Sequence, residues 1–303
     1  MKRRAWVALQ IVVGAAILWF LYHYFAHNWA DLRRSADAIE VHPVPLVAAG
    51  LIILVTYALL IGAWDAVLRG WGERLPYRDA ARIWCVSNLA RYVPGRVWQI
   101  AGMAALAQQA GVSPWAAAGS AIAVQLLAIA TGTLVTVAFA PDFGHPLLVG
   151  TAGLATAAAA AALAWPPGAA WLSGILSRIR GGPVEVRPVR GWPLLVSALV
   201  TAAAWVLYGL ALYLSVRGLT GRDVSVRASI GVFTGSYVAG LVNVFTAAGL
   251  GTRELILVNW LTGPLGPGAA FVVTAGSRIL MSVTEVVAAV AALALRTRKR
   301  DGR

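Results

Sequence analysis

The sequence predicts an all-α polytopic membrane protein with about six full transmembrane helices, two re-entrant helical hairpins in an inverted repeat, and both termini cytoplasmic. Of the 303 residues 59% are hydrophobic and only 12% are charged, about half of what soluble domains carry. No charged residue occurs between Arg96 and Asp142 or between Arg190 and Arg217, and apolar runs of about 20 residues span a bilayer. Despite the net charge of +13, this pattern excludes a nucleic-acid binder, a soluble enzyme and a disordered tail.

Six segments are long and apolar enough to cross the membrane outright, and they organise one integral membrane domain over residues 1–303. Two N-terminal helices occupy 5–66, the first repeat 77–140, two further helices 146–216, and the second, inverted repeat 224–295. The basic N-terminus is followed by an apolar run that is long enough to span, which favours an uncleaved first helix over a signal peptide. The predicted spans are 5–26, 44–66, 115–140, 146–165, 192–216 and 269–295.

Basic residues predict the orientation, because cytoplasmic loops carry an excess of Lys and Arg. With cytoplasmic termini, most of the basic residues fall in inner loops and tails, and six crossings return the C-terminus to the side where the chain begins. We therefore expect a multi-pass protein of the bacterial inner membrane.

Two stretches, 83–109 and 228–262, fit poorly as single crossings because polar and helix-breaking residues interrupt them. Treating each as a hairpin that enters and leaves by one face preserves the charge bias. Irregular backbone at membrane depth is tolerated where protein buries it or where it lines a wet cavity. Each hairpin precedes a span that contains Ala-Gly-Ser, at 118–120 and 275–277, which predicts an inverted repeat as in secondary transporters. Chance similarity in an Ala- and Gly-rich chain is the alternative.

The segment 91–98 forms the first candidate site. Pro94 and Gly95 break a helix and leave free N–H and carbonyl groups, and Arg91 and Arg96 flank that break. Free N–H groups and guanidinium forks suit a phosphate. The alternative is that both arginines reach the cytoplasmic interface around an ordinary turn. The candidate substrate-binding residues here are Arg91, Tyr92, Pro94, Gly95, Arg96 and Trp98.

The second candidate site combines 249–254 with the last span. Arg253 and Glu254 point about 100° apart on a helix and cannot pair face to face, whereas Arg278 and Glu285 share a helix face. An arginine at the bilayer centre costs about 2.5–3.5 kcal/mol, so we expect the two glutamates to neutralise the two arginines. A purely structural ion-pair network is the alternative. The candidate residues are Gly249, Gly251, Arg253, Glu254, Arg278 and Glu285, the glycines permitting a close backbone approach.

Other polar residues have simpler interpretations. Gln125 is interpreted as an interhelical hydrogen-bonding residue, and Asp65 as a marker of the membrane interface. His23 and His27 have a spacing compatible with a metal, but no third ligand is apparent, and Cys85 is the only cysteine. We expect no metal and no cofactor.

The segments 91–98 and 249–254 resemble two motifs of the transmembrane region of lysylphosphatidylglycerol synthases and of the stand-alone flippase-like proteins that share it. The first matches Arg/Lys-Tyr-x-Pro-Gly-Lys/Arg-x-Trp and the second Gly-Leu-Gly-x-Arg-Glu, and the resemblance covers nearly the whole chain. Two departures stand out. Residues 246–248 replace a Pro-Gly-rich lead into the second motif, and Gln125 and Leu126 replace a Glu-Arg pair. The loss of that acid argues against a shared proton-coupling scheme and fits a different headgroup.

The resemblance implies a lipid flippase. The fused synthases add a soluble domain that loads an amino acid onto phosphatidylglycerol, and only residues 296–303 follow the last span here, so we expect a transporter and not an enzyme. Arg91 and Arg96 would receive a phosphate-bearing headgroup from the cytoplasmic leaflet, and Arg253 with Arg278 would present it on the other side. The expected cargo is an aminoacylated phospholipid or a polyprenyl-phosphate-linked sugar.

Two other classes of function stay open. One is a membrane enzyme that transfers a lipid-linked group with Glu254 or Glu285 as base. The other is a non-transporting scaffold for a partner lipid synthase or glycosyltransferase. The residues leave the direction of transport, the energy coupling and the oligomeric state open.

Overall fold

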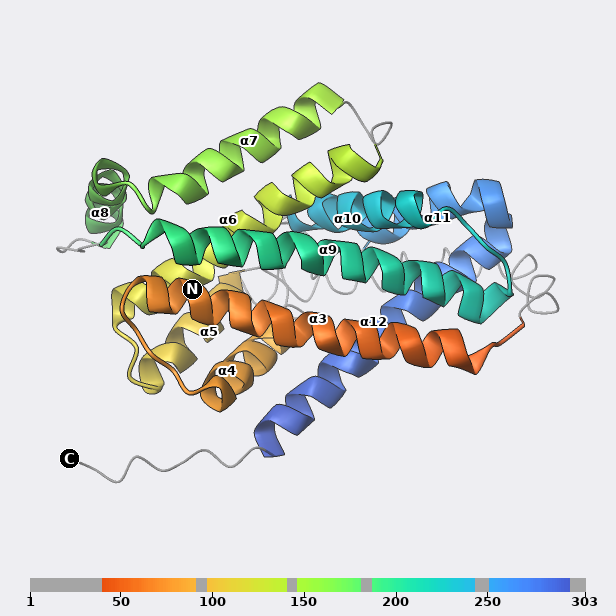
Figure 1. The fold of residues 1–303 in the computed structure, drawn as a ribbon, viewed down its shortest axis with the longest axis horizontal. Coiled ribbons are helices and arrows are strands. Elements are labelled where there is room, and N and C mark those ends of the chain that lie inside the picture. Colours follow the sequence, from red (N-terminus) through yellow and green to blue (C-terminus); the bar gives the residue numbers. More distant parts are fainter. Residues whose placement is uncertain (1–39, 91–96, 141–145, 181–186, 243–250, 295–303) are drawn as a thin grey trace, which may run out of the picture.

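The computed structural model describes residues 40–90, 97–140, 146–180, 187–242 and 251–294. Over these residues the chain forms ten α-helices and no strand, which confirms the all-α prediction (Figure 1). The first predicted span, 5–26, and both termini lie outside the described residues. The helices are α3 Pro43–Gly70, α4 Tyr77–Leu89, α5 Val97–Gln109, α6 Pro114–Phe139, α7 Pro146–Ala162, α8 Pro166–Arg180, α9 Gly191–Thr220, α10 Val226–Val242, α11 Thr252–Leu265 and α12 Pro267–Ala294.

Four helices, α3, α6, α9 and α12, are long and apolar enough to cross a membrane. They have 26 to 30 residues and correspond to the predicted spans 44–66, 115–140, 192–216 and 269–295. At a rise of 1.5 Å per residue each is about 40 Å long, more than a hydrocarbon core of about 30 Å. The predicted span 146–165 is shorter in the structure, because α7 ends at Ala162 and Pro166 begins α8.

Local sequence signals set the ends of the long helices. Pro43 and Pro114 occupy the first turn of α3 and α6, where a missing N–H leaves no hydrogen bond unmade. Gly221 follows α9 with φ of +64°, a conformation that side chains other than glycine seldom adopt. Inside the helices, hydroxyl groups such as that of Thr56 donate to the carbonyl four residues earlier, so these polar residues are satisfied locally.

The two predicted hairpin stretches each contain a pair of short helices. Helices α4 and α5 have 13 residues each and pack against one another, and α10 with 17 residues packs against α11 with 14. None of the four is as long as the hydrocarbon core is thick. The segments that join the members of each pair, 91–96 and 243–250, lie outside the described residues.

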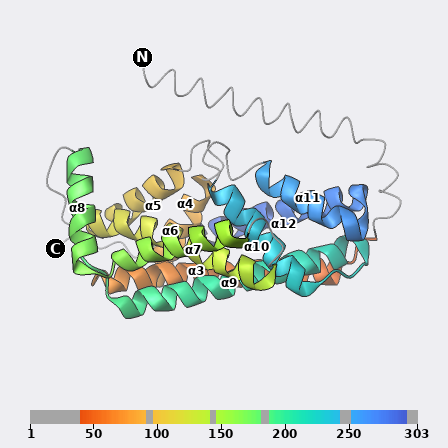
Figure 2. The ribbon, with the colours of Figure 1, turned by 90° about the horizontal axis from the view of Figure 1, so that it is seen from above.

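The long helices α3 and α9 lie side by side and antiparallel, as Figures 1 and 2 show. Matching hydrogen bonds hold their ends: the N–H of His42 donates to the Gly218 carbonyl at 2.8 Å, and the N–H of Arg190 donates to the Gly70 carbonyl at 3.2 Å. Around this pair, α4 packs on α12 and α10 packs on α6. Helix α5 packs on α6, and α11 packs on α12. The helices α3–α6 and α9–α12 therefore make corresponding sets of contacts.

Individual contacts recur in the same two sets of helices. A Cβ on Gly119 of α6 would lie 3.0 Å from the Trp71 ring after α3, and one on Gly276 of α12 would lie 2.6 Å from Leu219 near the end of α9. Ser87 of α4 donates to the carbonyl of Trp84, and Ser236 of α10 donates to the carbonyl of Phe233. Helices α7 and α8 stand apart from this scheme, with α7 packed on α6 and α8 lying across one end of the molecule (Figures 1 and 2).

Candidate functional site

A cavity of about 140 Å³ lies between α3–α6 and α9–α12, and each of these eight helices contributes to its lining. This volume is large enough to hold several water molecules. Most of its wall is apolar, but polar side chains from both the long and the short helices also line it. The polar lining residues are Asn88, Gln99, Gln125, Thr201, Tyr208, Tyr237, Arg253, Arg278 and Glu285.

Arg253 is the most deeply buried charge in this lining, with 2% of its surface exposed. It lies in the first turn of α11, and its guanidinium is 5.0 Å from the centre of the Phe233 ring and 5.6 Å from that of Tyr237. Its Nη2 donates to Met281 Sδ at 3.3 Å, a weak acceptor. Its Nε and Nη1 have no hydrogen-bond acceptor among the described residues.

This environment stabilises a positive charge incompletely. Aromatic faces attract a guanidinium by about 1–2 kcal/mol when water is excluded, whereas burying an ion costs several kcal/mol unless hydrogen bonds and a counter-charge compensate. No described carboxylate lies within 4.0 Å of Arg253 in an ion pair, and Glu254 and Glu285 attract its charge only from a longer distance. An anion that reaches the cavity would supply the missing acceptors.

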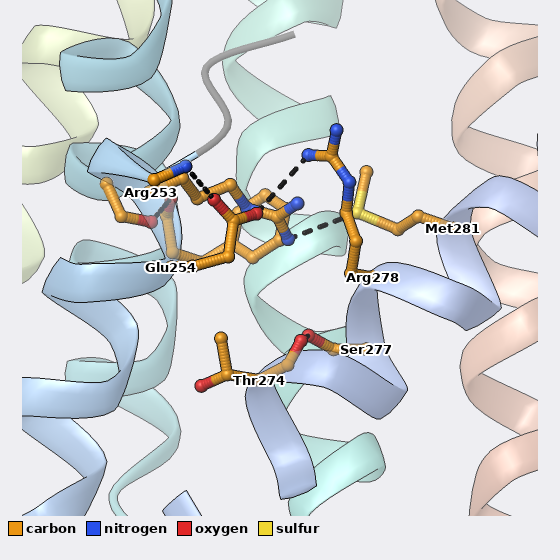
Figure 3. Close-up of polar contacts among 9 residues, drawn as sticks. Arg253, Glu254, Thr274, Ser277, Arg278 and Met281 are labelled. Carbon is orange, nitrogen blue, oxygen red and sulfur yellow. Dashed lines mark hydrogen bonds and ion pairs between the residues drawn. The ribbon is translucent and has the colours of Figure 1, made fainter. Parts of the chain in front are cut away.

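Glu254 positions the start of α11 and pairs with the next helix. Its Oε2 accepts the N–H of Gly251 at 2.9 Å, and its Oε1 lies 3.5 Å from Arg278 Nη1 of α12 (Figure 3). Gly251 has φ of +90°, so the turn into α11 requires a residue without a Cβ. The prediction that a glutamate neutralises Arg278 is confirmed, while Arg253 contacts aromatic rings in place of a glutamate.

An aromatic cluster from α9 and α10 supports Arg253. The Phe233 ring stacks on Tyr208 at 5.6 Å and on Tyr237 at 5.9 Å, and Tyr237 lies edge-on to Trp205 at 5.3 Å. Trp205 Nε1 also donates to the Ala128 carbonyl of α6 at 3.1 Å. This cluster fixes the rings beneath the guanidinium and ties them to the opposite set of helices.

The first set of helices lines the cavity with amides. Gln99 Nε2 of α5 donates to Asn88 Oδ1 of α4 at 2.5 Å, which joins the two helices of the first pair. Gln125 of α6 lines the same cavity, and its side chain forms no hydrogen bond within the described part of the chain. The sequence interpretation of Gln125 as an interhelical hydrogen-bonding residue is therefore wrong for those residues.

The structure brings together only part of the predicted site. Arg253, Arg278 and Glu285 line the cavity, and Glu254 and Gly251 lie beside it. Trp98 lies in the first turn of α5, is 43% exposed and is not part of the cavity lining. The predicted residues Arg91, Tyr92, Pro94, Gly95, Arg96 and Gly249 lie outside the described residues.

Sequence reasoning missed Phe233 and Tyr237. The available signal was their spacing of four residues in an apolar segment, which puts two rings on one helix face. Asp65, predicted to mark the interface, is buried and pairs with the exposed Arg69 at 2.7 Å. Over the described ranges, no three His, Cys, Asp or Glu side chains are grouped to hold a metal ion.

Comparison with known proteins identifies one family. The chain matches the lysylphosphatidylglycerol synthase TM region over residues 7–296, which is nearly its whole length. A comparison with curated proteins finds no match. Together with four helices that can cross a bilayer, the match makes this a membrane protein with several apolar helices. The chain belongs to the lysylphosphatidylglycerol synthase transmembrane-region family.

Proposed function

We propose that this protein is a translocase that moves an anionic, phosphate-bearing lipid across the bacterial inner membrane. The observation that carries the proposal is Arg253, a buried cation in a polar cavity with two nitrogens that lack an acceptor among the described residues. A phosphate supplies both the negative charge and the acceptor oxygens that this guanidinium needs. The chain belongs to a family of lipid-related membrane proteins, so a lipid phosphate is the ligand that we expect in this cavity.

The architecture we propose is an inverted repeat of α3–α6 and α9–α12. Its support is the antiparallel pairing of α3 with α9, the matching hydrogen bonds at their ends, and the recurring Gly119 and Gly276 contacts. The repeat then starts one long helix earlier in each unit than the sequence predicts. Substrate sites of inverted-repeat transporters lie at the repeat interface near the bilayer midplane, and the cavity between α3–α6 and α9–α12 supports such a site here.

The short helix pairs α4–α5 and α10–α11 are the proposed re-entrant hairpins. Their support is that each helix is too short for a full crossing and packs against its own partner. The distribution of basic residues supports cytoplasmic termini and an entry from the cytoplasmic side for the first hairpin.

In the proposed cycle, the acyl or polyprenyl chains remain in the bilayer while the headgroup crosses the cavity. Arg91 and Arg96 receive the phosphate from the cytoplasmic leaflet. Arg253 then binds it, and Arg278 joins as Glu254 gives up its ion pair. When the lipid leaves, Glu254 and Arg278 re-form the 3.5 Å pair, so the arginine is not left as an uncompensated buried charge.

A translocation assay in proteoliposomes tests the proposal. The full chain is reconstituted with acyl-labelled fluorescent phosphatidylglycerol, and dithionite quenching measures the rate at which lipid changes leaflet. Loss of a charge-assisted hydrogen bond costs about 1.5–3 kcal/mol, so Arg253→Ala should lower the rate about 10- to 100-fold. Arg253→Lys keeps the positive charge but loses the bidentate guanidinium geometry, so its translocation rate should lie between those of the wild type and Arg253→Ala.

The matched control is Arg74→Ala, which removes an exposed arginine in the loop between α3 and α4. It should translocate lipid at the wild-type rate, and thermal unfolding shows whether each variant is folded. Equal rates for wild type and a folded Arg253→Ala would contradict the proposal. Equal rates together with loss of a lipid synthase or glycosyltransferase from cells that lack this chain would favour the scaffold alternative.

A further inference from the structure

The cavity has a neutral side as well as a charged one. Asn88, Gln99 and Gln125 come from α4, α5 and α6, whereas Arg253 and its aromatic support come from α10 and α11. Gln125 interrupts an apolar helix, and its amide has no hydrogen-bond partner among the described residues. Gln125 is partly buried and lines the cavity, where its amide can donate to and accept from a ligand, so a ligand that binds Arg253 is expected to bind this amide as well.

Amides and hydroxyls are chemically matched. An amide offers both donors and an acceptor, and a hydroxyl group is likewise both donor and acceptor. The amide side of the cavity therefore suits a headgroup with hydroxyl groups, such as a glycerol or a sugar.

The groups that would recognise a positive charge are already engaged. Glu254 Oε1 already faces the Arg278 cation at 3.5 Å without a hydrogen bond, its Oε2 accepts the Gly251 N–H, and Glu285 also interacts within the protein. The faces of Phe233 and Tyr237, which could hold an ammonium, are covered by the Arg253 guanidinium. A cationic headgroup would also sit beside Arg253 and be repelled by it.

We propose that the cavity selects a lipid whose headgroup is a phosphate joined to a hydroxyl-bearing, uncharged group, with Arg253 on the phosphate and Gln125 on the hydroxyls. This inference rests on the proposed function, and it separates the two expected cargos. A headgroup that carries an aminoacyl ammonium is disfavoured, and a glycerol- or sugar-bearing one is favoured.

Competition binding tests the selection. Purified full-length protein is incubated with equal amounts of phosphatidylglycerol and lysyl-phosphatidylglycerol in mixed micelles, and native mass spectrometry counts the retained lipid. The wild type should retain phosphatidylglycerol about 10-fold over the lysyl lipid. Gln125→Glu adds a carboxylate that attracts the ammonium, and it should shift this ratio about 10-fold toward the lysyl lipid. Gln125→Leu should lower phosphatidylglycerol retention about 3- to 10-fold.

Gln108→Glu is the matched control, because it makes the same charge change on an exposed position of α5. It should leave the ratio unchanged. Equal retention of the two lipids by the wild type, with both lost in Arg253→Ala, would overturn the headgroup inference and leave the proposed function intact. Phosphatidylglycerol retention that is the same in wild type and Arg253→Ala would overturn the proposed function and this inference together.

Discussion

The two helix pairs reach the cavity with different chemistry from corresponding places. Ser87 and Ser236 make the same hydrogen bond, each to the carbonyl of an aromatic residue three positions earlier. The next residue is Asn88 in α4 and Tyr237 in α10. Asn88 binds Gln99 in the first turn of α5, whereas Tyr237 contacts Arg253 in the first turn of α11.

Two sets of helices with corresponding contacts, α3–α6 and α9–α12, therefore line one cavity with different chemistry. The amide pair is joined by one neutral hydrogen bond, from Gln99 to Asn88 Oδ1, while the aromatic–arginine pair leaves two arginine nitrogens without acceptors among the described residues. A polar lipid needs both kinds of contact, a charge for its phosphate and neutral groups for the rest of its headgroup.

The largest effect on stability is expected between α9 and α10, which are the most closely packed helices of the second set, α9–α12. A Cβ on Gly209 of α9 would lie 2.3 Å from Ile230 Cα of α10, so Gly209→Ala must push the two helices apart. We expect the free energy of unfolding to fall by about 3 kcal/mol, which is at the upper end of the cost of overpacking a core. Thermal unfolding in detergent measures it.

The control lies on α3, the corresponding long helix. A Cβ on Gly62 would meet nothing within 4 Å, so Gly62→Ala should leave the unfolding temperature unchanged or raise it, because alanine favours a helix. If the two variants unfold at the same temperature, α9 and α10 are not in the close contact described here.

An intermediate effect is expected at Glu254. Glu254→Ala removes both the hydrogen bond from the Gly251 N–H and the ion pair with Arg278, and it should lower the free energy of unfolding by about 2 kcal/mol. Glu254→Gln keeps an acceptor for the Gly251 N–H, so it should lower the free energy of unfolding by about 1 kcal/mol. Unfolding temperatures of the two variants and of Arg278→Ala measure this. Equal losses for Glu254→Ala and Glu254→Gln would show that the cap contributes nothing.

The smallest effect is expected at the amide pair. Single variants Asn88→Ala and Gln99→Ala and the double variant form a double-mutant cycle, and one neutral hydrogen bond at 2.5 Å should give a coupling of about 1 kcal/mol. These variants should also reduce lipid translocation less than Arg253→Ala does. A translocation loss equal to that of Arg253→Ala would place the dominant contact on the amide side.

The long helices and the broken helix pairs were predictable from sequence because they depend on local patterns. Uninterrupted apolar runs predict α3, α6, α9 and α12, and the need to neutralise charge in an apolar segment predicts that a glutamate pairs with Arg278, although not which one. The rings beneath Arg253 were not predictable, because their contact depends on how α10 packs on α11. Gln125 was misread for the same reason, since its environment is set by helices distant in sequence.

The central claim is that Arg253 binds a lipid phosphate in the cavity. Cryo-electron microscopy of the full chain in nanodiscs that contain phosphatidylglycerol tests it most directly. We expect phosphate density within about 3 Å of Arg253 Nε or Nη1, with the glycerol directed toward Gln125. A well-resolved cavity that holds only water, with no phosphate near the guanidinium, would contradict it.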